Sequence, residues 1–377
     1  MGKFENLVPE RVRALPAYVP GKPIKQAEAE SGVKMIKLAS NENPFGPSPK
    51  AVDAMQAAAE GANLYADNDN TALKNRLAEV HGLQPEQVLV TAGSTHLLDL
   101  LARTLLAPGL NAITSERSFI VYPIVTVAAG AEFRTVPMRN DAFDLDAISE
   151  AIDENTRLIF LANPNNPTGT VVDANALDAF LARIPDHVVV ALDEAYCDFA
   201  TDFARLRGIP YSHSLDYVKQ GRNVVVLRTF SKAHGLAGVR VGYGLGPAEL
   251  LGYTARLKTA FAVNSVGEAG ALAAIDDSAH IKKAVENNRA GAKYITSVLR
   301  ELGYQPIETW ANFICCEMHE DASAVSKRLQ NEGIIVRPLT GSWGWRTAIR
   351  ITIGTPEQNE KLANALKRIT AGTTVTK

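Results

Sequence analysis

The chain has 377 residues, of which 46% are apolar and 21% charged, ordinary values for a globular protein large enough for two domains. Its 39 basic and 41 acidic residues give a net charge of −2 without a long basic block, so neither nucleic acid nor an anionic membrane is expected as its main partner. Three cysteines give no disulfide framework. We expect a cytoplasmic protein, because no secretory signal or run of 18 apolar residues occurs.

Residues 88 to 246 alternate short apolar, β-branched runs with helical stretches, which is typical of a parallel sheet covered on both faces. Helices are expected between the strands at 96–106, 121–128, 145–152 and 175–182. The fold class is therefore α/β, with a mostly parallel seven-stranded sheet in a large domain over residues 46–264. The seven strands are expected at 87–91, 112–115, 132–137, 157–161, 188–192, 224–228 and 240–244.

The two flanks of this domain differ from it. The first 45 residues are rich in proline and are expected to lie as an arm over other parts of the molecule. After a helix at 247–258, residues 265–302 contain few helix breakers and predict one long helix or a kinked pair. Strands at 314–318, 334–337 and 348–353, with helices at 322–332 and from Pro356, predict a smaller α+β domain over residues 265–377.

Residues with useful chemistry follow the strand expected at 224–228. Thr229, Ser231 and Lys232 lie beyond its carboxyl end, where open α/β sheets bind ligands. A lone lysine there is usually a solvated loop residue. The glycines at 235–242 allow close backbone approach, however, and Arg240 offers a cation suited to a phosphate.

Two further strand ends carry polar residues. Asp193 follows an apolar strand, so its carboxylate should be desolvated and need a cation such as a protonated pyridine nitrogen; a helix N-cap is the simpler alternative. Tyr196, three residues on, is placed to hydrogen-bond the same ligand. Asn166 is fixed in the proline-rich turn 163–169, which by itself is also consistent with an ordinary turn.

A fourth strand end carries Gly93, Ser94 and Thr95 before a helix. Its N–H groups and hydroxyls would form an anion site, although helix capping explains the same residues. Four such groups at the carboxyl ends of strands in one domain favour a single ligand site.

These motifs resemble those of the fold-type I pyridoxal-phosphate aminotransferases, and within that superfamily the chain is most similar to the histidinol-phosphate aminotransferases. The resemblance covers nearly the whole chain. The segments that carry it are 18–23, 38–46, 165–169, 231–243, 264–265 and 350–354.

The resemblance implies a role for each cofactor-site residue. Lys232 would bind pyridoxal phosphate covalently and then move a proton, and Asp193 would hold the proton of the pyridine nitrogen. Asn166 and Tyr196 would hydrogen-bond the phenolic oxygen, and Phe119, otherwise a core residue, would stack on the ring. The phosphate would be held by Gly93, Ser94, Thr95, Thr229, Ser231 and Arg240, with Tyr65 reaching it from the second protomer of a homodimer, whose surface the arm 1–45 would also contact.

The substrate side depends on two arginines. Arg350 interrupts an apolar strand and so needs an anion, which the resemblance identifies as the substrate α-carboxylate. The resemblance assigns Arg337, otherwise a surface salt-bridge partner, to the substrate phosphate together with Tyr18.

Between the two arginines the chain departs from the family, whose members usually carry a segment of the Tyr/Phe-Gly-Leu-Pro type. Here Trp343 and Trp345 either pack the small domain or form a wall for an aromatic side chain.

The implied reaction is transamination of histidinol phosphate with 2-oxoglutarate, in histidine biosynthesis. The alternative is transamination of an aromatic amino acid, phenylalanine first. A third hypothesis is decarboxylation or elimination with the same cofactor. A fourth is a non-enzymatic regulator, but such regulators carry a DNA-binding segment ahead of this domain, and the first 45 residues leave no room for one. The expected partners are a small-molecule amino donor and a 2-oxo acid. The scattered histidines give no reason to expect a metal.

Overall fold

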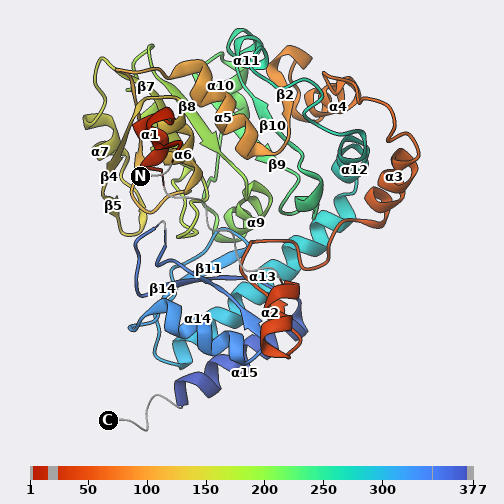
Figure 1. The fold of residues 1–377 in the computed structure, drawn as a ribbon, viewed down its shortest axis with the longest axis vertical. Helices are drawn as coiled ribbons and strands as arrows, with labels where there is room; N and C mark the ends of the chain where they lie inside the picture. Colours follow the sequence, from red (N-terminus) through yellow and green to blue (C-terminus); the bar gives the residue numbers. More distant parts are fainter. Residues whose placement is uncertain (1–2, 16–23, 342, 372–377) are drawn as a thin grey trace.

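The structure, a computed structural model, describes residues 3–15, 24–341 and 343–371. A large sheet flanked by helices occupies one half of the molecule, and a smaller group of helices and short strands lies beside it (Figure 1). This arrangement confirms the α/β class and the mostly parallel seven-stranded sheet that the sequence predicts.

The large sheet has the strand order β2-β10-β9-β8-β7-β3-β4. β10 runs antiparallel to both of its neighbours, and the remaining pairs are parallel. Each strand lies within two residues of its predicted position. The strands are β2 (Val88–Thr91), β3 (Asn111–Ser115), β4 (Glu132–Val136), β7 (Thr156–Ala162), β8 (Val189–Asp193), β9 (Val224–Thr229) and β10 (Gly242–Leu245).

The central strands are buried on both faces, as expected for a sheet covered by helices: all five residues of β8 and all four of β10 are buried. The helices that cover the sheet bury their apolar sides in the same core. They include α10, which the sequence analysis did not predict. α9, also not predicted, instead buries Ala200, Phe203 and Ala204 in the apolar cluster of the small domain. The helices are α5 (Ser94–Leu105), α6 (Val121–Ala128), α7 (Leu145–Glu150), α8 (Ala174–Leu181), α9 (Cys197–Arg207), α10 (Ser214–Lys219) and α11 (Ala248–Ala255); a hairpin of β5 (Met138–Arg139) and β6 (Ala142–Phe143) and the 3₁₀ turns η2 (Pro85–Gln87) and η3 (Ala237–Val239) complete this half.

The predicted long helical segment is two helices, α12 (Ser265–Ile275) and α13 (Ser278–Glu301). Asp277 separates them, and its side chain caps α13 by accepting a hydrogen bond from the His280 N–H. α12 packs against α3 (Pro49–Ala59) and α4 (Thr71–His81), neither of which was predicted. Because α12 shares the core of the large domain, its packing favours a boundary after Ile275; the division at residue 265 stays a prediction.

The small domain contains an antiparallel sheet of order β11-β14-β13, with β11 (Phe313–Glu317), β13 (Arg337–Pro338) and β14 (Ala348–Thr352). α14 (Ala322–Asn331), α15 (Pro356–Ala371) and the second half of α13 pack on it. The single strand predicted at 334–337 is wrong: β12 (Ile334–Ile335) pairs with β1 (Ile36–Lys37), whereas β13 pairs with β14. The chain therefore changes sheets at Val336, which places Arg337 opposite Arg350.

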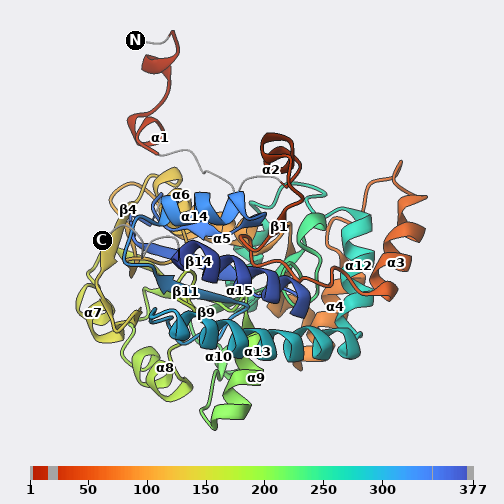
Figure 2. The ribbon, with the colours of Figure 1, turned by 90° about the horizontal axis from the view of Figure 1, so that it is seen from below.

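The N-terminal segment has two parts. α1 (Glu10–Arg13), preceded by η1 (Glu5–Leu7), projects from the body and touches it at α6 (Figure 2). α2 (Ile24–Ser31) and β1 lie against the small domain through the β1–β12 pair. Contact of the arm 1–45 with a partner protomer stays a prediction. Among the residues that the structure describes, no helix has the length and apolar character needed to cross a membrane.

Candidate active site

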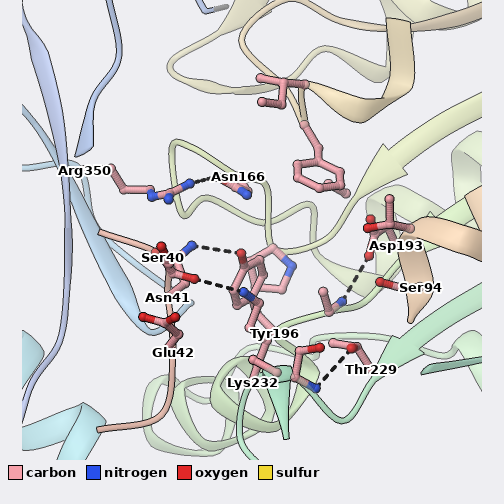
Figure 3. Close-up of a pocket in the computed structure, with 18 of the residues that line it drawn as sticks. Ser40, Asn41, Glu42, Ser94, Asn166, Asp193, Tyr196, Thr229, Lys232 and Arg350 are labelled. Carbon is pink, nitrogen blue, oxygen red and sulfur yellow. Dashed lines mark hydrogen bonds between the residues drawn. The ribbon is translucent and has the colours of Figure 1, made fainter. Parts of the chain in front are cut away.

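A cavity of about 310 Å³ lies between the carboxyl ends of the large-sheet strands and the small domain. Figure 3 shows side chains from both halves pointing into it. Most of the sequence-predicted site residues are brought together here. Those that line the cavity are Ser94, Thr95, Phe119, Asn166, Asp193, Tyr196, Thr229, Ser231, Lys232, Arg240, Arg337 and Arg350.

Lys232 lies directly after β9, in the loop that leaves the sheet. Its Nζ donates a hydrogen bond to the Ser40 carbonyl at 3.3 Å and lies 5.6 Å from the centre of the Tyr196 ring. Burial, followed by the positive charge of Arg350, lowers the pKa of Lys232 to about 8. A substantial fraction of this amine is therefore neutral near pH 8, the form in which lysine acts as a nucleophile or base.

Asp193 is the last residue of β8 and is 5% exposed. Its carboxylate accepts hydrogen bonds from the Tyr122 hydroxyl at 3.1 Å and from the Ala195 N–H at 3.3 Å. Burial raises the pKa of Asp193 to about 6, and the Tyr122 bond opposes that rise. The N-cap of α9 is Tyr196, so helix capping does not account for this carboxylate.

Tyr196 and Asn166 are held by residues from the other half of the molecule. Asn41 donates from Nδ2 to the Tyr196 hydroxyl at 2.9 Å, and its own N–H bonds Thr352 of β14. Asn166 accepts a hydrogen bond from Nη1 of Arg350 (Figure 3). The segment around Asn41 thus links the two domains across the cavity.

A cluster of hydroxyls and one guanidinium occupies the other end of the cavity. Because β10 is antiparallel, its first residue, Gly242, lies opposite Thr91 on one side and Thr229 on the other. Arg240, just before it, therefore reaches the start of α5 and donates to the Ser231 Oγ at 3.3 Å. A Cβ at Gly93 would lie 2.5 Å from Nη2 of Arg240, so only glycine allows this approach.

The small domain contributes two arginines from adjacent strands. Arg337 on β13 is the direct cross-strand partner of Arg350 on β14. Arg350 is 6% exposed and donates to the Ala39 carbonyl at 2.8 Å. Like charges placed opposite one another repel, so an anion between them would stabilise the pair. This end of the cavity is suited to a phosphate or carboxylate.

Trp343 and Trp345 have different surroundings. Trp343 lines the cavity, whereas Trp345 is 6% exposed, packs with Cys315, Leu339 and Ala348, and donates from Nε1 to Glu317 at 2.6 Å. Trp345 therefore packs the small domain, and Trp343 both packs against the same cluster and lines the cavity. A wall for an aromatic side chain stays a prediction.

Three predicted residues do not line the cavity. Gly93 contacts the guanidinium of Arg240, which lines the cavity in its place. Tyr65 is 84% exposed and stacks on Phe261 at 4.5 Å between ring centres, so it takes no part in the site of its own chain. Tyr18 lies outside the described residues.

The sequence analysis missed four polar residues of this region. Ser40, Asn41 and Glu42 line the cavity, and Tyr122 holds Asp193. The first three fall in the segment 38–46, which carried the resemblance without being given a role. Tyr122 lies one turn beyond Phe119, and its spacing from Phe119 was the only available signal.

The arrangement fits pyridoxal phosphate on structural grounds. A buried carboxylate with a raised pKa faces the cavity and would be stabilised by a protonated ring nitrogen. The start of α5, its hydroxyls and Arg240 form an anion site of the kind that binds phosphate. Among the described residues, no group of His, Cys, Asp and Glu is arranged to hold a metal ion.

Comparison with known proteins gives a consistent result. The family model described as aminotransferase class I and II matches residues 33–366. Histidinol-phosphate aminotransferase 2 of Pseudomonas aeruginosa is 43% identical over 374 residues, which cover 98% of this chain and 100% of the relative. The histidinol-phosphate aminotransferase of Moorella thermoacetica is 43% identical, with coverage of 96% and 92%. The crystal structure of histidinol-phosphate aminotransferase from Sinorhizobium meliloti in complex with pyridoxal-5′-phosphate has a TM-score of 0.87 at 29% identity and covers 97% of each chain.

Proposed function

Because this chain belongs to the aminotransferase class I and II family, we propose that it is a pyridoxal-phosphate-dependent enzyme that transaminates histidinol phosphate with 2-oxoglutarate. The cofactor and donor are those named for its relatives and structural neighbour. The proposal rests on one observation: a single cavity joins Lys232 and Asp193 at one side to Arg337 and Arg350 at the other.

The cofactor end of the cavity has the groups that amine chemistry requires. Pyridoxal phosphate, when bound, supplies an electron sink for the carbanion that forms when the donor loses its Cα proton. Lys232 is the base for that proton, because burial lowers its pKa to about 8 and leaves much of the amine neutral near that pH. Asp193 keeps the ring nitrogen protonated, and Tyr122 holds the Asp193 carboxylate in place.

The two arginines are assigned to different anionic groups of the substrates. Histidinol phosphate has a phosphate and no carboxylate, and we assign its phosphate to Arg337. 2-Oxoglutarate has two carboxylates, and we assign the one next to its keto carbon to Arg350, which is held at the cavity wall by the Ala39 carbonyl. One cavity thus accepts both the donor and the acceptor in turn.

We further propose that the protein works as a homodimer in the cytoplasm. Tyr65 projects from the surface and stacks on Phe261, leaving its hydroxyl available to a second protomer. This placement supports a shared site in which Tyr65 reaches the phosphate of the partner's cofactor.

A half-reaction screen tests the proposed function. Enzyme loaded with pyridoxal phosphate is mixed with histidinol phosphate, phenylalanine, tyrosine or aspartate, and the cofactor absorbance is followed by stopped flow. We expect the highest second-order rate constant with histidinol phosphate. A higher value for phenylalanine would replace the proposed donor with an aromatic amino acid, and no absorbance change with any of the four would contradict transamination of these donors.

A further inference from the structure

Trp343 occupies a position that joins the two domains. It lies in the loop between β13 and β14 and lines the cavity, and its indole Nε1 donates to the Ser118 carbonyl at 2.8 Å. Ser118 belongs to the large domain and directly precedes Phe119, another cavity residue. One side chain of the small domain is therefore anchored to the large domain at the cavity wall.

The same indole lies against both substrate-side arginines. The guanidinium carbon of Arg337 is 5.6 Å from its ring centre, and that of Arg350 is 5.8 Å away. Both distances are within the range of about 6 Å in which a cation is attracted to an aromatic face, and tryptophan gives the strongest such attraction. Because Arg337 and Arg350 are also cross-strand partners, the ring holds two mutually repelling cations at one wall.

We propose that Trp343 is a positioning residue that makes Arg337 and Arg350 one anion-binding unit, and that it thereby favours substrates with a phosphate or a second carboxylate over those with a single carboxylate. This inference rests on the proposed aminotransferase function, but it does not depend on which amino donor is native. It assigns a role to the segment in which the chain departs from the family pattern.

The contribution of the Trp343 ring and that of its N–H group can be measured separately with two substitutions. Trp343→Phe keeps an aromatic face and loses the hydrogen bond to Ser118, whereas Trp343→Leu loses both. Trp345→Phe is the matched control, because Trp345 also donates an indole hydrogen bond, to Glu317, but does not line the cavity. Thermal melting of each holoenzyme establishes that the variants are folded.

The first measurement is binding of maleate, a dicarboxylate that cannot be transaminated, to the loaded enzyme by isothermal titration calorimetry. We expect the Kd to rise about tenfold in Trp343→Leu and about threefold in Trp343→Phe, factors typical of a lost cation–π contact and a lost hydrogen bond. Trp345→Phe should bind as the parent does. Parent-like binding by both Trp343 variants, or an equal loss in Trp345→Phe, would overturn the proposal.

The second measurement is selectivity between acceptors. Enzyme carrying the aminated cofactor is reacted with 2-oxoglutarate, which has two carboxylates, and with pyruvate, which has one. The preference for 2-oxoglutarate should fall several-fold in Trp343→Leu and stay unchanged in Trp345→Phe. An unchanged preference in Trp343→Leu contradicts the role of Trp343. Neither measurement uses histidinol phosphate, so failure of that donor in the half-reaction screen would leave this test intact.

Discussion

The hydroxyl of Tyr122 donates a hydrogen bond to the Asp193 carboxylate at 3.1 Å, and the ring that carries it is fully buried and stacked on Phe160 at 4.6 Å between centres. The stacking fixes the hydroxyl in one place. A hydrogen bond to the charged form of an acid lowers its pKa, so Tyr122 counteracts the burial that raises the pKa of Asp193. Tyr122 therefore favours the charged carboxylate, the form that we propose to pair with a protonated ring nitrogen.

Replacing Tyr122 with phenylalanine should raise the pKa of Asp193. The acid then ionises at a higher pH, so we expect the ascending limb of the kcat–pH profile to move upward, with lower activity below neutral pH and recovery as the pH rises. Tyr217→Phe is the matched control, since this buried tyrosine donates to Asp178 away from the cavity. A Tyr122→Phe profile identical to that of the parent would show that the hydroxyl has no influence on Asp193.

Lys232→Ala should abolish turnover while pyridoxal phosphate still binds, because the residues around its phosphate and ring remain. Loss of a positioned base alone costs about 10²–10⁴-fold, and here the covalent attachment is lost as well. Cofactor content is measured by absorbance after gel filtration, and turnover by coupled assay. Lys293→Ala, on the surface of α13, controls for removal of a positive charge. Activity within tenfold of the parent would exclude Lys232 as the catalytic amine.

Covalent attachment of pyridoxal phosphate to the cofactor-free protein should also depend on pH. The reactive form is the neutral amine, and burial and Arg350 lower the pKa of Lys232 to about 8. The attachment rate should therefore rise with pH through a midpoint near 8 and level off at higher pH. Arg350→Met removes the positive charge that lowers the pKa of Lys232 most, so the midpoint of the attachment rate should move to higher pH. A midpoint that stayed in place would mean that Arg350 does not act on this lysine.

Most strands were predictable because they are short apolar or β-branched runs bounded by turns, and the run at 188–192 is too short and too continuously apolar for a surface helix. The helices α3, α4, α9 and α10 were not predicted. α3, which is rich in alanine, packs on another helix, α12, and lies outside the alternation of strands and helices from which the other helices were predicted.

The gathering of the polar site residues at one cavity was predictable because they follow the carboxyl ends of neighbouring strands. The contacts of Asn41 and Trp343 were not, because they join segments 155 and 225 residues apart in the chain, and only the docking of the two domains brings these together. The single strand expected at 334–337 failed because three β-branched residues run directly into Arg337, and the change of sheet at Val336 leaves no mark in the sequence.

Gly93→Ala should weaken cofactor binding. Its backbone has φ +87°, a conformation that strains any residue with a side chain, and the new methyl group would lie 2.5 Å from the Arg240 guanidinium. The Arg240 guanidinium, the free end of a flexible side chain, would shift, and the strained backbone would disturb the N–H groups at the start of α5, so we expect the Kd for pyridoxal phosphate to rise about tenfold by fluorescence titration. Gly238→Ala is the control in the same region, because a methyl group there meets nothing within 4 Å. Equal affinities in the two variants would contradict a role for the start of α5 in binding the phosphate.

Arg337→Ala and Arg350→Ala should affect different substrates. Loss of a charge-assisted hydrogen bond costs about 1.5–3 kcal/mol, so Arg337→Ala should lower kcat/KM for histidinol phosphate roughly ten- to a hundredfold. Phenylalanine has no anion at that end and should be affected less. Arg350→Ala should instead impair 2-oxoglutarate and phenylalanine, which both have an α-carboxylate. Equal losses for histidinol phosphate and phenylalanine in Arg337→Ala would mean that Arg337 shapes the cavity without binding the phosphate.

The shared site predicted for Tyr65 can be tested with mixed dimers. Tyr65→Ala should lower activity at limiting pyridoxal phosphate, and Lys232→Ala should be inactive. In a dimer with one chain of each kind, a site that takes its lysine from the first chain and its tyrosine from the second has both residues intact. If Tyr65 acts across the interface, mixing the two proteins under conditions that exchange subunits should restore activity at limiting cofactor. Tyr253→Ala, at another exposed tyrosine, should mix with Lys232→Ala without any gain. If Tyr65 acts within its own chain, each mixed dimer has one site that lacks the lysine and one that lacks the tyrosine, and activity would stay at the level of the Tyr65→Ala chains alone.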